Sequence, residues 1–354
     1  MKFFSAEALN LMGKTYNPSD VGMMGSIFGY PYLEDESELI IIPVPWDVTV
    51  SYRSGAAKGP QAILDASPQL DLSLFQIVKP WNYSACMQAP VAWIRTNAEK
   101  HRAQAAKVIA SLENGEKPED VILQEVNVAC QLMIDHVKAQ SKQVLESGKI
   151  AAVLGGDHST PLGLIAALSE RMQFAILQID AHMDLREAYE GFTYSHASIM
   201  YNALKMEGVQ SLVQVGIRDF CQEELDYIAQ TNQVIHTFYD DEIKTGLLRG
   251  QSWLEWTEKI INKLPENVYI SFDIDGLAPS LCPNTGTPVP GGLSFEQVTF
   301  LLMQIVKSGK KIIGFDLSEV APGHNEWDAN VGARILYRLI TMTGISQGKI
   351  SLLA

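Results

Sequence analysis

The sequence predicts an α/β fold in which helices cover both faces of a central, mainly parallel sheet. Seven short apolar runs have the continuous Val, Ile, Leu and Phe content that is typical of strands buried on both faces. They span residues 39–43, 149–154, 174–179, 212–216, 234–238, 268–272 and 311–315. Polar loops or helical patterns follow these runs, and such alternation is typical of three-layer α-β-α proteins.

The longest predicted helix covers residues 119–147. Its apolar side chains recur at the spacing of one helical face, and Gly148 stands where the pattern stops. Residues 74–102 show no period, because Pro80, Trp81, Pro90 and Trp93 interrupt them. We therefore expect a helix before the second strand and an irregular insertion near residues 74–102.

The chain is expected to form one domain over residues 38–354. An N-terminal extension over residues 1–37, punctuated by glycines and Pro31, is expected to pack on that domain. No repeat, low-complexity tract or separating linker interrupts the 354 residues. A hydrophobic content of 47% is sufficient to bury a large core.

The charge balance limits the classes of partner. The formal net charge is −14, whereas proteins that bind nucleic acid or anionic membranes need a basic surface. The sequence therefore predicts no nucleic-acid partner and no membrane partner. It weakly favours a small cationic substrate.

Cysteine use and the N-terminus predict a cytoplasmic protein. The four cysteines are widely spaced and contain no C-x-x-C pair, so neither a disulfide framework nor a thiolate zinc site is expected. Glu7 interrupts the region that would be the apolar part of a signal peptide. No run approaches the roughly 18 apolar residues of a membrane span.

Three strand ends carry polar motifs. They are Gly155-Gly156-Asp157-His158-Ser159, Asp180-Ala181-His182-Met183-Asp184 and Asp273-Ile274-Asp275-Gly276. A spacing of two residues on extended backbone points alternate side chains to one side. If the strands are neighbours, four carboxylates and two imidazoles converge, from His158, Asp180, His182, Asp184, Asp273 and Asp275.

Such a cluster predicts a metal site. Each motif alone could cap a helix or satisfy a turn, but carboxylates a few ångströms apart cannot all stay ionised without cations. Six ligands suit two ions that share bridging carboxylates. Oxygen and imidazole ligands without thiolate favour Mn²⁺, and leave Ni²⁺, Co²⁺ and Fe²⁺ as alternatives. Two such ions can generate hydroxide for attack on a carbon centre.

The three motifs resemble those of the arginase and agmatinase superfamily, the binuclear-manganese ureohydrolases, and agmatinase-like members most closely. The resemblance covers most of the chain. It includes glycine-proline and glycine-rich loops and a last site strand, at residues 55–63, 284–293 and 315–322. It implies an arginase-like fold and two Mn²⁺ ions.

The resemblance also implies roles for individual residues. His158 and Asp184 would complete one metal site and His182 and Asp275 the other, while Asp180 and Asp273 would bridge them. His196, Glu319 and Asp184 would be the catalytic residues. Glu319 would pair with the substrate's guanidinium group, and His196 would pass a proton to the leaving amine. Without the metal motifs, we would interpret Glu319 as a partner in a structural ion pair and His196 as a surface histidine.

The favoured substrate is agmatine, which would give urea and putrescine. Residues 184–196 resemble the agmatinase version of this loop and lack the asparagine and serine with which arginases hold the α-carboxylate of arginine. Arg186 could instead pair with a substrate carboxylate, which leaves arginine, guanidinobutyrate and formiminoglutamate as alternatives beside free guanidine. Arg186 could also be a surface residue that pairs with Glu187 or Glu190.

A different class of function is an inactive, metal-binding paralogue that acts as an assembly subunit. Ala278 and Asn284 depart from the residues that many family members have at these positions. No expected ligand or catalytic residue is missing, which favours the enzyme. The resemblance further implies a homo-oligomer, a trimer or a hexamer.

Overall fold

A computed structural model describes residues 17–20, 22, 24–231 and 234–353 of the chain. Its strands are β1 (Leu39–Val44), β2 (Ala85–Met87), β3 (Ile150–Gly155), β4 (Phe174–Ile179), β5 (Val209–Ile217), β6 (Ile235–Tyr239), β7 (Asn267–Asp273) and β8 (Lys311–Ser318). Its α-helices are α2 (Gly59–Ala66), α3 (Ala92–Glu113), α4 (Asp120–Glu146), α5 (Leu162–Ser169), α6 (Ile199–Ala203), α7 (Gln222–Gln230), α8 (Asp240–Leu248), α9 (Trp253–Ile261), α10 (Phe295–Lys307) and α11 (Trp327–Ser346).

The eight strands form one sheet in the order β2-β1-β3-β8-β7-β4-β5-β6. Every ladder between neighbouring strands in this sheet is parallel. All seven predicted strands are present, and their ends lie within a few residues of the expected ones. The predicted fold class is therefore confirmed.

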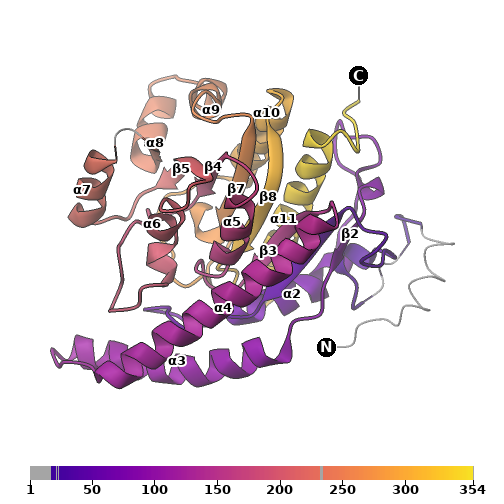
Figure 1. Cartoon of the computed structure of the whole chain (residues 1–354). Coiled ribbons are helices and arrows are strands. Elements are labelled where there is room, and N and C mark those ends of the chain that lie inside the picture. Colours follow the sequence, from indigo (N-terminus) through magenta and orange to yellow (C-terminus); the bar gives the residue numbers. More distant parts are fainter. Residues whose placement is uncertain (1–16, 21, 23, 232–233, 354) are drawn as a thin grey trace.

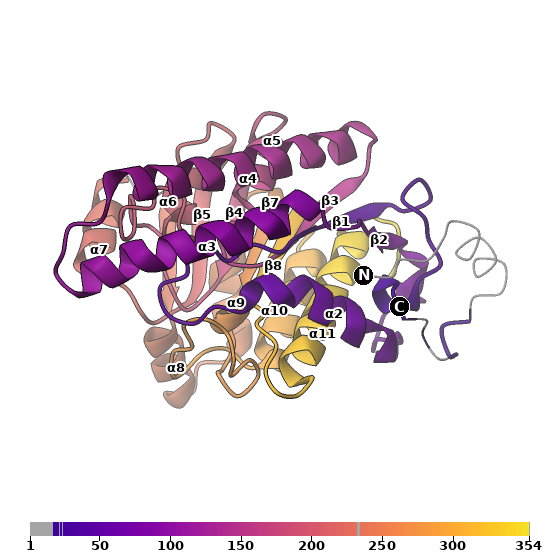
Figure 2. The ribbon, with the colours of Figure 1, turned by 90° about the horizontal axis from the view of Figure 1, so that it is seen from below.

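Helices cover both faces of the sheet (Figures 1 and 2). One core lies between the sheet and α2, α9, α10 and α11, and the other lies between the sheet and α3 to α6. Successive strand residues alternate between the two cores: Ile41 belongs to the first, and Ile40 and Ile42 belong to the second. This two-sided burial explains why apolar residues occur on both faces of each strand and not only at alternate positions.

The region near residues 74–102 is more regular than expected. It contains the short edge strand β2, and its last part, from Ala92, forms the first turns of α3. Trp93 lies within that helix, and its ring packs edge-on against His136 of α4, with the ring centroids 5.1 Å apart. A three-residue strand has too few positions to show a period, so the sequence did not reveal β2.

The predicted N-terminal extension lies partly outside the described residues. Within its described part, Ile27, Phe28 and Tyr30 are buried and belong to the first core. The Phe28 ring lies 5.1 Å from the ring of Tyr337 on α11. The described end of the extension thus contributes apolar side chains to the core.

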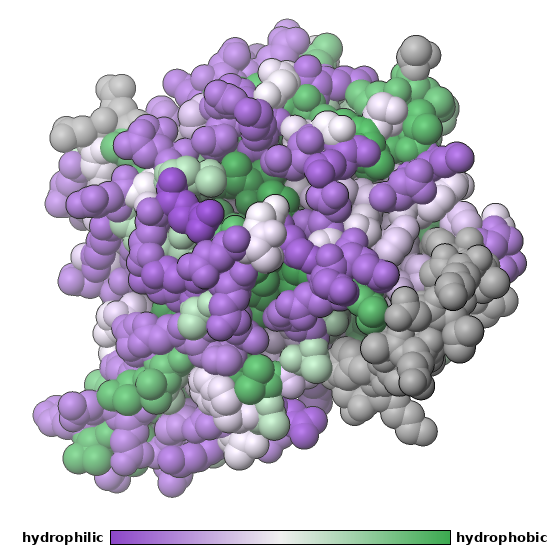
Figure 3. All heavy atoms as spheres, turned by 45° about the vertical axis from the view of Figure 1, so that its right-hand side comes forward, coloured by the Kyte–Doolittle hydropathy of each residue, from purple (hydrophilic) through white to green (hydrophobic). Residues whose placement is uncertain are grey.

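One face of the molecule is predominantly polar. In Figure 3 hydrophilic side chains cover most of the visible face, and apolar side chains form separate small patches. None of the described helices combines the length and apolar character that a membrane crossing needs.

Candidate metal centre

The sheet order places the three motifs at one edge. Strands β3, β8, β7 and β4 are consecutive neighbours in the centre of the sheet and run in the same direction. The carboxyl ends of parallel strands meet at one edge, where open α/β sheets bind ligands. His158 follows β3, Asp180 follows β4, Asp273 ends β7 and Glu319 follows β8.

A first group of potential ligands surrounds the His158 imidazole. Its Nδ1 lies 3.0 Å from Asp180 Oδ2 and 3.4 Å from Asp273 Oδ2. These three residues have ligand atoms within 4.8 Å of one another. Asp184 Oδ2 lies 2.9 Å from the same nitrogen. Four of the six expected side chains therefore meet at one point.

A second group lies beside the first and shares Asp180 with it. His182 Nδ1 is 3.6 Å from Asp180 Oδ1 and 3.1 Å from Asp275 Oδ2. The two oxygens of Asp180 therefore face two different imidazoles, which is the geometry expected of a bridging carboxylate. Asp273 belongs to the first group only, so its bridging role stays a prediction.

Neighbouring amides orient these carboxylates. Asp180 Oδ1 accepts a hydrogen bond from the His182 amide at 2.7 Å, and Asp180 Oδ2 accepts one from Gln178 Nε2 at 2.8 Å. Asp275 Oδ1 accepts one from the Ala181 amide at 3.0 Å. The second group is thus held in place by the backbone of the motif itself, as outer partners of metal ligands commonly are.

The electrostatics of the cluster favour bound cations. Burial raises the pKa of Asp273 well above its ordinary value, and the charges of Asp275 and Asp180 raise it further. Burial, and then the charge of Asp180, raises the pKa of Asp184 to about 7. Burial alone would lower the pKa of His158, but its carboxylate partners raise it well above 6.5. Divalent cations would relieve this repulsion, because they satisfy the carboxylates without protons.

A buried carboxylate oxygen supports the same conclusion. Glu319 Oε2 is buried and has no hydrogen-bond partner. Buried polar atoms normally have partners, so an unsatisfied oxygen at this site indicates that a ligand completes it. The donor set of both groups is imidazole and carboxylate, which fits Mn²⁺ and similar divalent ions.

Glu319 lies directly against the first group. Its Oε1 accepts a hydrogen bond from the His158 amide at 3.0 Å, and its backbone carbonyl accepts one from Thr285 Oγ1 at 2.9 Å. Both Glu319 (φ 62°) and Asp184 (φ 56°) adopt the left-handed region. Non-glycine residues in that region are strained, and such strain often occurs at functional sites. The sequence offered no signal for it.

A cavity of about 170 Å³ opens beside the second group. His182, Asp184 and His196 line it. Burial, and then the positive charges of His182 and His158, lowers the pKa of His196 to about 3, so that its imidazole is neutral at pH 7. The structure thus brings His196 into the same cavity as two of the expected ligands.

The outer part of this cavity contains residues that the sequence did not single out. Tyr189, Asp219 and Phe220 line it together with Arg186. The Arg186 guanidinium lies 4.7 Å from the centroid of the Tyr189 ring. Asp219 and Phe220 follow β5, and only the sheet order shows that this strand end lies beside β4.

The alternative of a surface ion pair for Arg186 is not observed. Within the described part of the chain, no ion pair joins Arg186 to Glu187 or Glu190. Its side chain is half-buried at the cavity instead. Arg186 therefore lies at the cavity that His182, Asp184 and His196 also line.

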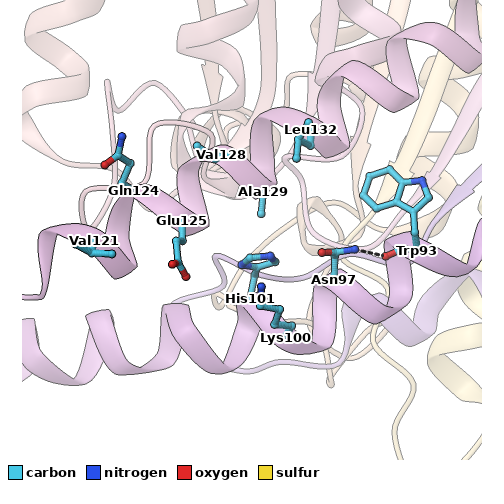
Figure 4. A pocket seen from close by; sticks show the side chains of 10 residues that line it. All are labelled: Trp93, Asn97, Lys100, His101, Val121, Gln124, Glu125, Val128, Ala129 and Leu132. Carbon is cyan, nitrogen blue, oxygen red and sulfur yellow. Dashed lines mark hydrogen bonds between the residues drawn. The ribbon is translucent and has the colours of Figure 1, made fainter.

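His101 lines a separate groove between α3 and α4 (Figure 4), outside both metal groups. Burial, and then the charge of Lys100, lowers its pKa. Burial also lowers the pKa of His136 and His236, and His324 lies exposed in the loop before α11. None of these four histidines belongs to either group of potential ligands among the described residues.

Comparisons with known proteins agree with this geometry. The model of the arginase family matches residues 37–342. An N(1)-aminopropylagmatine ureohydrolase of Thermus thermophilus is 31% identical over 327 residues, which cover 91% of this chain and 94% of that protein. An agmatinase of Bacillus anthracis is 28% identical, with 87% of this chain and 92% of that protein covered.

Solved structures share the fold. Proclavaminate amidino hydrolase from Streptomyces clavuligerus superposes with a TM-score of 0.70 at 24% identity. The superposition covers 93% of this chain and 95% of that one.

Proposed function

The chain belongs to the arginase family and is a ureohydrolase, a hydrolase that acts on amidine C–N bonds; on this basis we propose that its substrate is agmatine. The products would be urea and putrescine. The proposal places a cationic guanidinium at the metal centre and an amine tail in the cavity lined by His196 and Asp219.

The observation that carries this proposal is the unsatisfied Oε2 of Glu319. This carboxylate oxygen is buried and has no partner, while Oε1 is held by the His158 amide at 3.0 Å. A guanidinium group presents several N–H donors to a carboxylate, and the resulting charge-assisted hydrogen bonds are among the strongest in proteins. A guanidinium bound at Glu319 would therefore satisfy an atom that the fold leaves open.

Family members bind two metal ions, and we propose that this chain binds two Mn²⁺, with Ni²⁺ as the alternative. His158, Asp184, Asp180 and Asp273 would hold one ion. His182 and Asp275, with Asp180 and Asp273 shared, would hold the other. Two bound ions supply the chemistry of lowering the pKa of water, which provides the nucleophile at neutral pH.

The protein side chains would position and protonate the reactants. Glu319 would orient the guanidinium carbon, and Asp184 would accept a hydrogen bond from the attacking water. The water oxygen forms the new bond to the guanidinium carbon, and the bond from that carbon to the alkyl nitrogen breaks. Asp184 and the neutral imidazole of His196 would take up the protons that the water loses, and His196 would pass them to that nitrogen, so that the amine leaves as an ammonium group and urea remains.

N(1)-aminopropylagmatine is a second candidate substrate. Three relatives with 30–31% identity carry the name N(1)-aminopropylagmatine ureohydrolase, whereas four relatives named agmatinase have 27–29%. The aminopropyl extension adds a positive charge to the tail. Asp219 provides a carboxylate at the rim of the cavity, with 66% of its side chain exposed.

A substrate panel tests these proposals. Purified protein would be reconstituted with Mn²⁺ or Ni²⁺, and urea release would be measured from agmatine, N(1)-aminopropylagmatine, arginine, guanidinobutyrate and guanidine. Formiminoglutamate would be followed by formamide release. We expect the highest kcat/KM for one of the two amine-tailed guanidines. A preference for arginine would overturn the substrate proposal.

The same experiment addresses the inactive paralogue. Two bound ions per chain without turnover of any compound would support an assembly subunit instead of an enzyme. The trimeric or hexameric state and the cytoplasmic location stay predictions, and light scattering of the metal-loaded protein would test the first.

A further inference from the structure

The loop between Asp184 and His196 contains a tight turn. The amide of Tyr189 donates to the Phe192 carbonyl at 3.1 Å, and the amide of Phe192 donates to the Tyr189 carbonyl at 2.8 Å. Glu190 (φ 54°) and Gly191 (φ 83°) occupy the two central positions with positive φ. Such a two-residue connection is the tight hairpin turn that closes a pair of extended segments. Phe192 is fully buried and anchors one side of the turn.

Asn127 of α4 holds this turn from outside. Its Nδ2 donates to the Gly191 carbonyl at 3.0 Å, and its Oδ1 accepts from the Thr193 amide at 2.9 Å. One side-chain amide thereby satisfies both a carbonyl and an amide that the turn leaves unpaired. Residues 127 and 191 are separated by 64 positions in the chain.

An apolar contact accompanies this pair of hydrogen bonds. A Cβ built on Gly191 would lie 2.9 Å from Cδ2 of Leu123. Leu123 precedes Asn127 by one helical turn, so both side chains lie on the same face of α4. The turn is therefore in close contact with α4, and a side chain at position 191 would require Leu123 to shift and would be strained at a φ of 83°.

The turn also connects to the proton-transfer histidine. The ring of Tyr189 lies edge-on to the His196 ring, with the centroids 6.2 Å apart and the planes at 88°. Arg186 also contacts Tyr189, and its guanidinium lies 4.7 Å from the centroid of the Tyr189 ring. A shift of the turn would move Tyr189 and with it the ring contact of His196, whose Nδ1 also lies 3.4 Å from Ser195 Oγ.

Helix α3, the neighbour of α4, binds a second segment that lines the cavity. Arg102 of α3 donates from Nη1 to the carbonyls of Val48 and Val50, at 3.2 Å and 2.6 Å. The next residue, Ser51, lines the cavity with His196. Helices α3 and α4 thus support two separate loops beside the proposed site.

We propose that Asn127 is a positioning residue for His196. It acts through the turn at residues 189–192 and the Tyr189 ring, and it touches neither substrate nor metal ligands. This inference rests on the proposed role of His196 as the proton donor to the leaving amine. Misplacing such a group by about 1 Å can reduce a rate by about 100-fold.

The test compares Asn127→Ala with the matched control Gln131→Ala. Gln131 lies one turn further along α4, and its side-chain amide donates to Asp135 of the same helix at 2.9 Å. We expect Asn127→Ala to lower kcat for the best substrate about tenfold with little change in KM. Asn127→Asp keeps the acceptor for the Thr193 amide but places a carboxylate oxygen against the Gly191 carbonyl oxygen, so we expect a loss of kcat at least as large. Gln131→Ala should match the parent.

A double-mutant cycle separates positioning from general damage. In a His196→Ala background, Asn127→Ala should cause no further loss of kcat, because the group that it positions is gone. Equal losses of kcat in both backgrounds would overturn the inference. Bound metal and the thermal unfolding midpoint are measured for each variant, and Asn127→Asp serves as the test if Asn127→Ala does not fold.

The outcome also distinguishes the two proposals. If His196→Ala alone leaves kcat unchanged, the proposed role of His196 fails. If His196→Ala lowers kcat but Asn127→Ala does not, only the inference about Asn127 fails.

Discussion

Replacing Glu319 by Gln should weaken recognition of the guanidinium while leaving the fold intact. The amide oxygen of Gln can still accept the hydrogen bond from the His158 amide, now made by Oε1 at 3.0 Å. The unsatisfied Oε2, however, is replaced by an NH₂ group that can only donate. A guanidinium also only donates, so the substrate loses its acceptor at this position.

The size of the effect follows from the lost interaction. Hydrogen bonds to charged groups contribute about 1.5–3 kcal/mol, and about 1.4 kcal/mol corresponds to a factor of ten. One lost bond therefore predicts a decrease in kcat/KM of about 10-fold to about 100-fold. Because the site is buried, water cannot replace the lost acceptor, so we expect a decrease in kcat/KM toward the upper end of this range.

Steady-state urea release from agmatine, at saturating Mn²⁺, measures this decrease. Glu326→Gln is the matched control, since Glu326 is an exposed carboxylate in the loop after the same strand. Metal content and the unfolding midpoint of Glu319→Gln should equal those of the parent. An unchanged kcat/KM would refute the assignment of Glu319 to the guanidinium, and a loss of metal would show that Glu319 supports the ligands instead.

Three further predictions follow from the structure. Removal of metal by a chelator should abolish urea release and lower the unfolding temperature, and added Mn²⁺ should restore both. Turnover by protein shown to be free of metal would contradict a metal-dependent reaction. Asp219→Asn should raise KM for amine-tailed guanidines by less than about fivefold, because an exposed charge pair contributes at most about 1 kcal/mol. The increase should be smaller at high salt, which screens the pair. Asp226→Asn, at another exposed aspartate, is the control, and a change in KM that does not depend on salt would indicate a different role for Asp219. Hydrogen bonds from Lys138 and Lys142 lower the pKa of Glu170 to about 2, so its stabilising effect should be present above about pH 4.5 and be lost as the pH falls toward 2. The difference in unfolding midpoint between the parent and Glu170→Gln, followed from pH 7 to pH 3, should shrink accordingly, and a difference that does not depend on pH would contradict this ion pair.

The elements and motifs that depend on local chemistry were predictable. A strand such as β7 has the consecutive apolar residues Val268, Tyr269 and Ile270 because both faces of the sheet are buried, and this run can be recognised wherever the strand lies in the sheet. The spacing of Asp180, His182 and Asp184 is likewise a property of a few consecutive residues. The edge strand β2 was not predictable, since three residues carry no period.

The contacts that refine the site were not predictable, because they join distant parts of the chain. The bond between Glu319 and the His158 amide spans 161 positions, and that between Asn127 and Gly191 spans 64. The environment of Arg186 also depends on packing, which places its guanidinium on Tyr189 instead of on a neighbouring carboxylate.

The sequence by itself determined the strands, the residues at their ends and the chemical type of the site, because apolar runs and ligand spacing act over a few residues. Only the tertiary structure decided that β3, β8, β7 and β4 are neighbours. That order makes Asp180 common to both ligand groups and leaves one oxygen of Glu319 without a partner. The physical reason is that close approach of charged side chains is set by the packing of whole elements, which no local pattern contains.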